Sequence, residues 1–292
     1  MFKNNFTHFS LCCADRLLSF DRPAVMGIVN CTADSFYDGG THASVPEAVD
    51  FAKALHDEGA DILDLGVVST RPGAALLSPD DEAHRLATLV SAVRSALPDA
   101  VISVDTCFSL PAKAAVQAGA DIINDISGGA FDPLMFDVVA QLRTPYILMH
   151  NTLASADNPS GRSDASRHNR SADQLLNELA LFFSSSLNQL ETRGVRDVII
   201  DPGFGFSKSL DENYSVLSLL PELRRLFPNN PLLVALSRKS MIYKALDITP
   251  ADALTGTVAL HAVALLSGAQ LLRVHDVRDA RQTSAIISKL YR

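Results

Sequence analysis

The stretch AVMGIVN, residues 24–30, begins a series of short apolar runs, each followed by a longer segment with helical periodicity. Near-continuous hydrophobicity is typical of a strand whose two faces are both covered, as in a parallel sheet beneath helices. Seven further runs follow along the chain: DILDLG (61–66), VISVD (101–105), DIINDIS (121–127), YILMH (146–150), VIIDPG (198–203), LLVALS (232–237) and QLLRVHD (270–276). Strands that alternate with helices in this way favour an α/β fold, a (β/α)8 TIM barrel, over an open doubly wound sheet.

The segments between the strands show helical spacing and glycine stops. VPEAVDFAKALHDEGA (45–60) predicts a helix that ends at Gly59, and PAKAAVQAGA (111–120) predicts one that ends near Gly119. HFSLCCADRLLSFDRP (8–23) has no place in the eight repeats, so we expect a hairpin or short helix that closes the bottom of the barrel. We therefore treat residues 1–292 as a single barrel domain with residues 1–23 as an N-terminal cap, and the polar stretch 151–174 as a long mobile loop on the catalytic face.

Composition excludes several classes of protein. A net charge of -8 without a run of Lys or Arg argues against nucleic acid as a partner. No stretch reaches the roughly 20 apolar residues of a membrane span, and the N-terminus lacks the features of a secretory signal. The 4 cysteines form no CxxC pair and are interpreted as reduced thiols, with no metal site among them. We expect a cytoplasmic protein that does not bind membranes.

Polar side chains stand at the end of nearly every predicted strand, where barrel enzymes carry their reactive groups. One such residue is most often a cap or a loop hydrogen bond. Many together are costly to bury unless they are paired or hold a ligand. In chain order they are Asn30, Asp64, Asp105, Asn124, His150, Asp201, Ser237, Arg238, Lys239, Arg273, His275 and Asp276.

Seven motifs in a fixed order resemble those of the dihydropteroate synthases, from about Met26 to the C-terminal helix. They are MGIVNCTADSFYDGG (26–40), LGVVSTRPGA (65–74), ISVDTCF (102–108), ADIINDISGG (120–129), DPGFGFSKSLDEN (201–213), LSRKSMI (236–242) and LLRVHDV (271–277). The resemblance implies a transferase that condenses 6-hydroxymethyl-7,8-dihydropterin pyrophosphate with p-aminobenzoate. The products would be pyrophosphate and 7,8-dihydropteroate for folate biosynthesis, and sulfonamides would compete with p-aminobenzoate.

The resemblance also assigns roles, and the residue types suit them. A pterin edge of fixed donors and acceptors needs an acceptor carboxylate and a two-sided amide. The pterin set is Asp105, Asn124, Asp201, Lys239 and Met149, and the catalytic set is Asp105, Lys239, Arg71 and Asp38. The alternative, purely structural interpretation of Lys239 is that it forms a salt bridge on the outside of the barrel.

The leaving pyrophosphate needs cations and Mg²⁺ as a cofactor, because charge builds on the departing oxygen. The pyrophosphate set is Asn30, Thr70, Arg71, Arg273 and His275, with Asn30 also the metal ligand. Arg273 and His275 alternate along the last strand, so both are expected on one face as an anion clamp. The alternative, purely structural interpretations are a core histidine for His275 and a surface turn for STRPGA (69–74).

The p-aminobenzoate set consists of Ser237, Phe36, Pro72, Phe206 and Gly205. Ser237 is expected at a helix N-terminus, where its hydroxyl and backbone N–H would hold the carboxylate. Each phenylalanine taken alone would by default be a core residue.

The chain departs from the family pattern at Ala33, at Val67-Val68 and after His150, where NTLASADNPSGR (151–162) replaces a short basic turn. A pterin-binding methyltransferase domain and a non-catalytic pterin-binding paralogue are the alternative functions. The very apolar segment TGTVALHAVALLSGA (255–269) predicts a homodimer surface, although packing on the barrel would explain much of its apolarity, and the amphipathic DARQTSAIISKLYR (279–292) predicts an outer helix.

Overall fold

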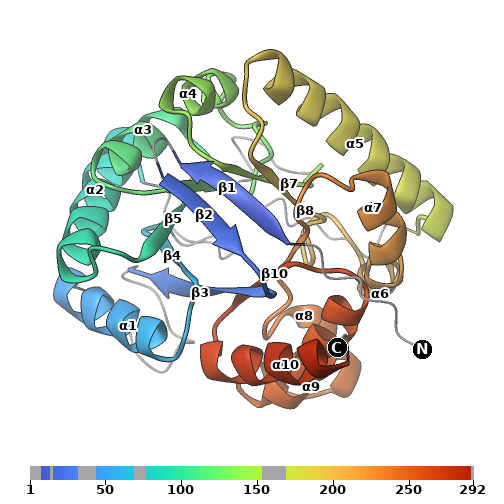
Figure 1. Cartoon of the computed structure of the whole chain (residues 1–292). Helices are drawn as coiled ribbons and strands as arrows, with labels where there is room; N and C mark the ends of the chain where they lie inside the picture. The colour runs from blue at the N-terminus through green and yellow to red at the C-terminus, as the bar shows by residue number, and fades with distance from the viewer. Residues whose placement is uncertain (1–7, 14–15, 32–43, 69–76, 153–168, 291–292) are drawn as a thin grey trace.

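The computed structural model describes residues 8–13, 16–31, 44–68, 77–152 and 169–290. Its central feature is an eight-stranded parallel sheet in the order β8-β7-β6-β5-β4-β3-β10-β9. A parallel bridge between Ile200 and Leu232 joins the two ends of this order, so the sheet closes into the predicted TIM barrel (Figure 1). The strands are β3 (Ala24–Asn30), β4 (Ile62–Gly66), β5 (Val101–Asp105), β6 (Ile122–Asp125), β7 (Tyr146–Met149), β8 (Val198–Asp201), β9 (Leu233–Val234) and β10 (Leu271–Val274).

All eight predicted strands are present; β3 and β5 span their whole apolar runs, and the regular part of each of the other six is shorter than its run. The seventh is the shortest, because only Leu233 and Val234 pair regularly with β10 within LLVALS (232–237). The residues that follow turn away to carry the polar groups of the site. The strand prediction is therefore confirmed in number and order, with the ends set by where ladder pairing stops.

Helices surround the barrel and bury their apolar faces against the outer side of the strands (Figure 1). Gly59 and Gly119 follow the first and third helices with φ of 98° and 112°, the left-handed conformation that made glycine the predicted stop. The helical elements are α1 (Val45–Asp57), α2 (Pro79–Ala96), α3 (Ser109–Gln117), α4 (Met135–Leu142), α5 (Ala172–Thr192), α6 (Leu210–Ser218), α7 (Leu220–Leu226), α8 (Ser240–Leu246), η2 (Ala251–Ala253), α9 (Leu254–Leu266) and α10 (Val277–Lys289).

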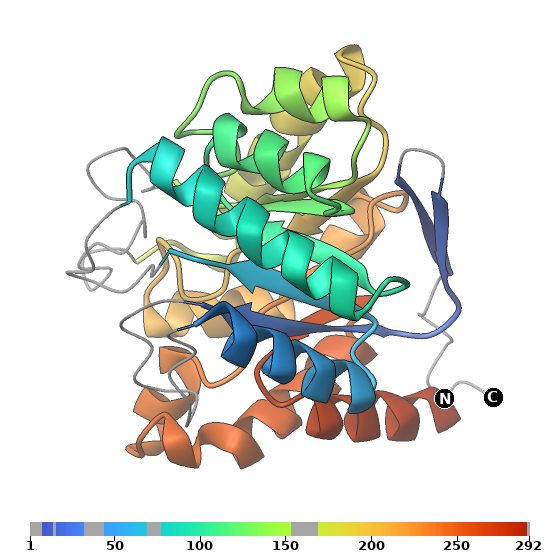
Figure 2. The same ribbon diagram turned by 90° about the vertical axis from the view of Figure 1, so that its left-hand side faces the viewer.

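An antiparallel hairpin of β1 (Phe9–Cys13) and β2 (Arg16–Phe20) crosses the amino-terminal end of the barrel (Figures 1 and 2). Its inward side chains, among them Leu11 and Leu18, pack on the lowest layer of barrel residues, which includes Met26 and Ile62. Alternation along β1 explains this arrangement, because every second side chain is buried. The prediction that this segment closes the barrel bottom is confirmed, and of the two forms predicted, hairpin or short helix, the structure shows the hairpin.

Within the described residues, no single helix has both the length and the apolar composition of a membrane span. The helix pair 240–246 and 251–266 meets those criteria only when taken together, and it is bent by 97°.

Candidate functional site

The polar strand ends meet at the carboxyl-terminal end of the barrel, opposite the β1–β2 hairpin (Figure 2). Because the strands are parallel, residues at the ends of β4, β5, β6, β8 and β10 lie around one opening. Register places Asp105 beside Asn124 on neighbouring strands. The candidate site is built at this end from side chains far apart in the sequence.

Arg273 is the centre of this arrangement. Its Nε donates to Asp64 Oδ2 at 2.6 Å, and its Nη2 donates to Asp105 Oδ2 at 2.8 Å. Asp64 Oδ2 also accepts from Asn124 Nδ2 at 3.0 Å. A carboxylate can only accept, so the Asn124 amide must turn its nitrogen to Asp64, and its carbonyl oxygen is the end that can accept from a ligand. One arginine thus fixes two carboxylates and, through Asp64, one amide.

Burial and charge set the protonation of these groups. Burial raises the pKa of Asp105 to about 7, although Arg273 opposes the rise, and the nearby Asp64 adds to it. Burial lowers the pKa of Arg273, but the charges of Asp64 and Asp105 more than offset that and leave its pKa above the ordinary value. Asp105 therefore changes charge near neutral pH while Arg273 stays a cation.

Asp201 lies at the end of β8 and is buried. Its Oδ1 accepts from the N–H of Gly203 at 2.7 Å, which closes the first residues of the following turn. Burial raises the pKa of Asp201, and the charge of Lys239 opposes the rise. The carboxylate thus faces a site that also contains an ammonium group.

Lys239 points toward the 202–207 turn and not to the outside of the barrel. Its Nζ donates to the carbonyl of Phe204 at 2.5 Å and lies 4.7 Å from the centre of the Phe206 ring. A Cβ on Gly205 would come within 3.2 Å of the Lys239 side chain, so the glycine leaves room for it. The alternative of an external salt bridge for Lys239 is wrong.

An apolar wall lies beside these polar groups. Met149 at the end of β7 packs with Ile126 and Phe206 in a small buried cluster, and Cys107 lies against it. Burial raises the pKa of the Cys107 thiol well above its ordinary value, so this sulfur is an inert neighbour. A flat ring could lie on such a wall while polar groups hold its edge.

One geometric expectation is wrong. Ser237 does not begin a helix, because Arg238 takes a left-handed φ of 53° and Lys239 is extended as the N-cap of α8. The Ser237 hydroxyl instead accepts from the backbone N–H of His275 at 3.3 Å. The Arg273 guanidinium pairs with the carboxylates of Asp64 and Asp105, and the anion clamp of Arg273 and His275 stays a prediction.

Arg238 and Asp276, both counted among the polar strand ends, pair with each other. Arg238 Nη2 and Nε donate to the two oxygens of Asp276, each at 2.8 Å. This fork-to-fork pair ties the loop after β9 to the start of α10 and gives both residues a structural role.

Asn30 ends β3 and is half-buried, with its Oδ1 beside Gly66 at the same end of the barrel. Among the described residues, no group of three or more His, Cys, Asp or Glu side chains could hold a metal ion. Val67, where the family pattern has a polar residue, packs in the apolar core. Of the other predicted site residues, five lie outside the described residues: Phe36, Asp38, Thr70, Arg71 and Pro72.

Sequence reasoning placed Asp64 at a strand end but left it out of the site, and it missed Lys208 altogether. Asp64 is 0% exposed and holds both Arg273 and Asn124. An acidic residue in the middle of an apolar run was the available signal for Asp64. Lys208 offered no such signal, because in the sequence it stands between two serines in a polar segment.

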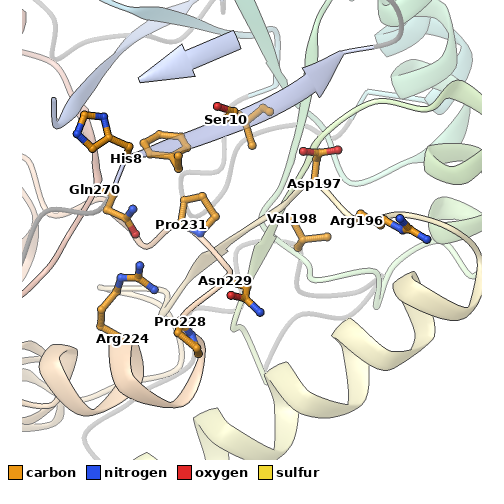
Figure 3. A pocket seen from close by; sticks show the side chains of 12 residues that line it. His8, Ser10, Arg196, Asp197, Val198, Arg224, Pro228, Asn229, Pro231 and Gln270 are labelled. Atoms are coloured by element: carbon orange, nitrogen blue, oxygen red, sulfur yellow. The ribbon is translucent and has the colours of Figure 1, made fainter. Parts of the chain in front are cut away.

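A cavity of about 370 Å³ lies at the other end of the barrel (Figure 3). Residues of β1, of the segment before β8 and of the loop after α7 line it, including Ser10, Asp197, Arg224 and Asn229. It contains none of the predicted site residues, so it is separate from the candidate site.

Comparisons with known proteins agree with this geometry. Residues 26–275 match the model of a family described as pterin binding enzyme. A dihydropteroate synthase of Synechocystis is 41% identical over 93% of this chain and 91% of its own length. The chain therefore belongs to the dihydropteroate synthase family of pterin binding enzymes.

Two solved dihydropteroate synthases extend the likeness to the fold. The enzyme of Yersinia pestis, solved with a sulfonamide drug, superposes with a TM-score of 0.85 at 34% identity and covers 97% of this chain and 98% of its own. The enzyme of Xanthomonas albilineans, solved with 4-aminobenzoic acid, gives a TM-score of 0.83 at 39% identity with the same coverage of 97% and 98%. Likeness over nearly the whole chain makes this barrel that of a pterin-binding transferase and confirms the predicted fold and family.

Proposed function

We propose that this protein condenses 6-hydroxymethyl-7,8-dihydropterin pyrophosphate with p-aminobenzoate and releases pyrophosphate and 7,8-dihydropteroate for folate biosynthesis. The observation that carries the proposal is the set of buried and half-buried polar side chains at the carboxyl ends of the strands. Asp105, Asn124 and Asp201 supply acceptors and an amide, while Arg273 and Lys239 supply fixed cations. Such a set is costly to bury unless its members are paired or hold a ligand, and the Asp201 carboxylate and the Asn124 carbonyl oxygen keep acceptor capacity for one.

The pterin edge fits this set. The Asp201 carboxylate accepts from the amino and ring N–H groups, and the Asn124 carbonyl oxygen accepts from another ring donor. The Lys239 ammonium donates to the ring carbonyl side. Met149 and Phe206 lie against the ring faces.

The charges of the pocket favour carbon–oxygen bond breaking ahead of attack. Three carboxylates (Asp64, Asp105, Asp201) face two cations (Arg273, Lys239), a balance of one negative charge when all are ionised. A positive charge that develops on the pterin methylene is stabilised there. The aryl amine is already a nucleophile, so no strong general base is required.

Pyrophosphate would leave on the side of Asn30, Arg273 and His275, where Thr70 and Arg71 would complete the anion site. Asp38 would support the developing cation or Arg71. Mg²⁺ binds through few protein oxygens and keeps water and phosphate ligands, so a single carboxamide oxygen from Asn30 suits it. When bound, the ion would neutralise charge on the departing pyrophosphate. Asn30 is the residue that would hold it.

The p-aminobenzoate ring would lie by Gly205 and Phe206, with Phe36 and Pro72 as further walls. Ser237 would reach its carboxylate through the hydroxyl alone, since the helix begins three residues later. The support is the aminobenzoate-bound relative at 39% identity.

The test is a coupled assay of pyrophosphate release with both substrates. Asp201→Asn keeps the size of the side chain and its bond to Gly203 but removes the charge and one acceptor. We expect a loss of kcat/KM of at least about 100-fold, the cost of hydrogen bonds to a charged group. Asp137→Asn, on the exposed surface of α4, is the matched control. Normal release by Asp201→Asn would refute the proposal.

The same assay tests the metal. Chelation of Mg²⁺ should slow turnover, and Asn30→Ala should raise the Mg²⁺ concentration needed for half-maximal rate. An unchanged Mg²⁺ requirement in Asn30→Ala would exclude Asn30 as the ligand.

A homodimer is the proposed assembly, in the cytoplasm. The outward face of α9 carries Thr255, Ala259 and Val263 at four-residue spacing, and Val263 is 43% exposed. The helix has no charged residue. An exposed stripe without charge is typical of an interface between proteins.

A further inference from the structure

Lys208 is a buried cation that none of the steps above uses. It stands between the 202–207 turn and α6, and its side chain is almost fully buried. Lysine is among the residues least often buried, and when it is buried its ammonium must be paired. Its surroundings therefore reveal what it does.

The Lys208 ammonium meets three acceptors. Its Nζ lies 3.2 Å from the carbonyl of Gly203, 3.2 Å from the carbonyl of Phe206 and 3.1 Å from His150 Nδ1. An ammonium has three N–H donors and no acceptor, so each proton finds one partner. Burial, and then the charge of Arg170, lower the pKa of Lys208 to about 7, but three acceptors at this distance fit the charged form.

His150 is a neutral ring that links Lys208 to Glu178. Burial and the charge of Lys208 lower its pKa to about 4. Since Nδ1 accepts from Lys208, the ring proton sits on Nε2, which lies 3.2 Å from Glu178 Oε1. The contact with His150 is the first cause that lowers the pKa of Glu178 to about 2, with burial opposing and Arg170 adding to the fall.

Arg170 closes the network from the outside. It binds Glu178 through Nη1, at 2.6 and 2.8 Å, and Glu212 through Nε and Nη2, both at 2.9 Å. Its Nη2 also donates to the carbonyl of Ser207 at 2.6 Å. Two cations and two carboxylates balance, so the network is neutral and can stay buried.

The 202–207 turn lies between this network and the ligand pocket. Lys208 binds the Gly203 and Phe206 carbonyls, while Lys239 binds the Phe204 carbonyl and lies over the Phe206 ring. Gly203 joins the two sides directly, because its N–H donates to Asp201 and its carbonyl accepts from Lys208. A side chain at Gly203, where φ is 72°, would collide with the His150 carbonyl.

We propose that Lys208 is a positioning residue for the pterin pocket, acting through the 202–207 turn on Lys239 and Asp201. It does not touch substrate. Its three N–H groups donate to His150 Nδ1 and to two carbonyls of the turn, on the side away from Lys239, and so hold the turn in place. The turn in this conformation presents the Phe204 carbonyl and the Phe206 ring to Lys239. The inference rests on the proposed function, since the pocket it supports is the pterin pocket.

Lys208→Met removes the donors and keeps an unbranched side chain that is one heavy atom shorter. Two carbonyls and one imidazole nitrogen then lose their partner, and the turn relaxes toward other conformations. We expect the dissociation constant for 6-hydroxymethylpterin to rise about 10- to 100-fold, the range for hydrogen bonds to a charged donor. Lys113→Met, an exposed lysine on α3, is the control and should bind normally.

A double-mutant cycle with Lys239→Met separates positioning from general stability. Titration calorimetry measures pterin binding by the wild type, both single variants and the double variant, at a temperature where circular dichroism shows each to be folded. If Lys208 acts through Lys239, then Lys208→Met costs much less in the Lys239→Met background. Equal costs in both backgrounds, or normal binding by Lys208→Met, would overturn the inference.

Lys208→Gln provides a second route if Lys208→Met does not fold. Glutamine keeps two N–H donors in the buried site, so we expect weaker binding than the wild type and faster amide exchange in residues 202–207, with unchanged exchange in the β1–β2 hairpin. Wild-type binding and exchange at the turn would overturn the inference. Failure of the wild-type protein itself to bind the pterin would instead refute the proposed function.

Discussion

The guanidinium of Arg273 is held between the carboxylates of Asp64 and Asp105, and the Asp64 side chain is fully buried. Removing one member of a buried ion pair leaves the other charge without compensation, which costs far more than losing a surface pair. The site thus contributes to stability as well as to binding.

Arg273→Met should lower the free energy of unfolding by about 3–5 kcal/mol, because Asp64 loses its cation in a buried position. Arg193→Met, which breaks an exposed pair with Asp137, should cost about 0–1 kcal/mol. Urea denaturation measures both. Equal losses in the two variants would contradict the central place of Arg273.

Asp105 makes stability depend on pH. Its folded pKa of about 7 lies above the ordinary 3.8, so between these values the folded state binds the proton that the unfolded chain has released. The free energy of unfolding then falls as pH rises through this window. Asp105→Asn removes the dependence, so from about pH 5 to about pH 7.5 its urea midpoint should fall less than that of the wild type. Parallel changes would exclude a raised pKa.

At the scale of elements, the site depends on where strands end and turns begin. Regular pairing stops at Asp201 and at Val274, and the turns beyond carry Gly203, Phe206 and His275. The opposite end of the barrel is closed by β1 and β2. The amino-terminal end of the barrel therefore contributes mainly to stability, and the carboxyl-terminal end carries the candidate site.

The hairpin offers a matched pair of leucines to test this division. Leu11 is 1% exposed and faces the barrel, whereas Leu17 is 68% exposed. Leu11→Ala should cost about 2–5 kcal/mol of unfolding free energy, the range for a buried large-to-small change, and Leu17→Ala should cost little. Pyrophosphate release by folded Leu11→Ala should match the wild type; a lower rate would show that the two ends are coupled.

At the scale of the whole molecule, the uncharged stripe on α9 predicts self-association. Val263→Asp places a charge on its most exposed large apolar residue and should convert a dimer to a monomer in sedimentation velocity. Leu181→Asp, on α5, changes an exposed leucine (73%) away from this stripe and should leave the dimer intact. A monomeric wild type, or a dimer in Val263→Asp, would contradict the assembly.

Much of the fold could be predicted because local patterns dictate it. The apolar runs predicted the strands, and the glycines at 59 and 119 predicted helix ends. The apolar residues at 8–23, which have no place in the eight repeats, predicted a hairpin or short helix at the barrel bottom. The prediction that Ser237 lies at the N-terminus of a helix was wrong, because Asp276, from another part of the chain, holds Arg238 in a left-handed conformation. Tertiary contacts overrode local expectation there.

The sequence by itself determined the barrel, the family and the ring of polar residues at the strand ends, since periodicity and motif order are local properties. Only the tertiary structure decided how those residues pair. Asp64 and Arg273 are far apart in the chain, as are His150 and Lys208, and each pair meets because the closed barrel brings distant strand ends together. Pairing of buried charges depends on distance and burial in three dimensions, which no one-dimensional pattern contains.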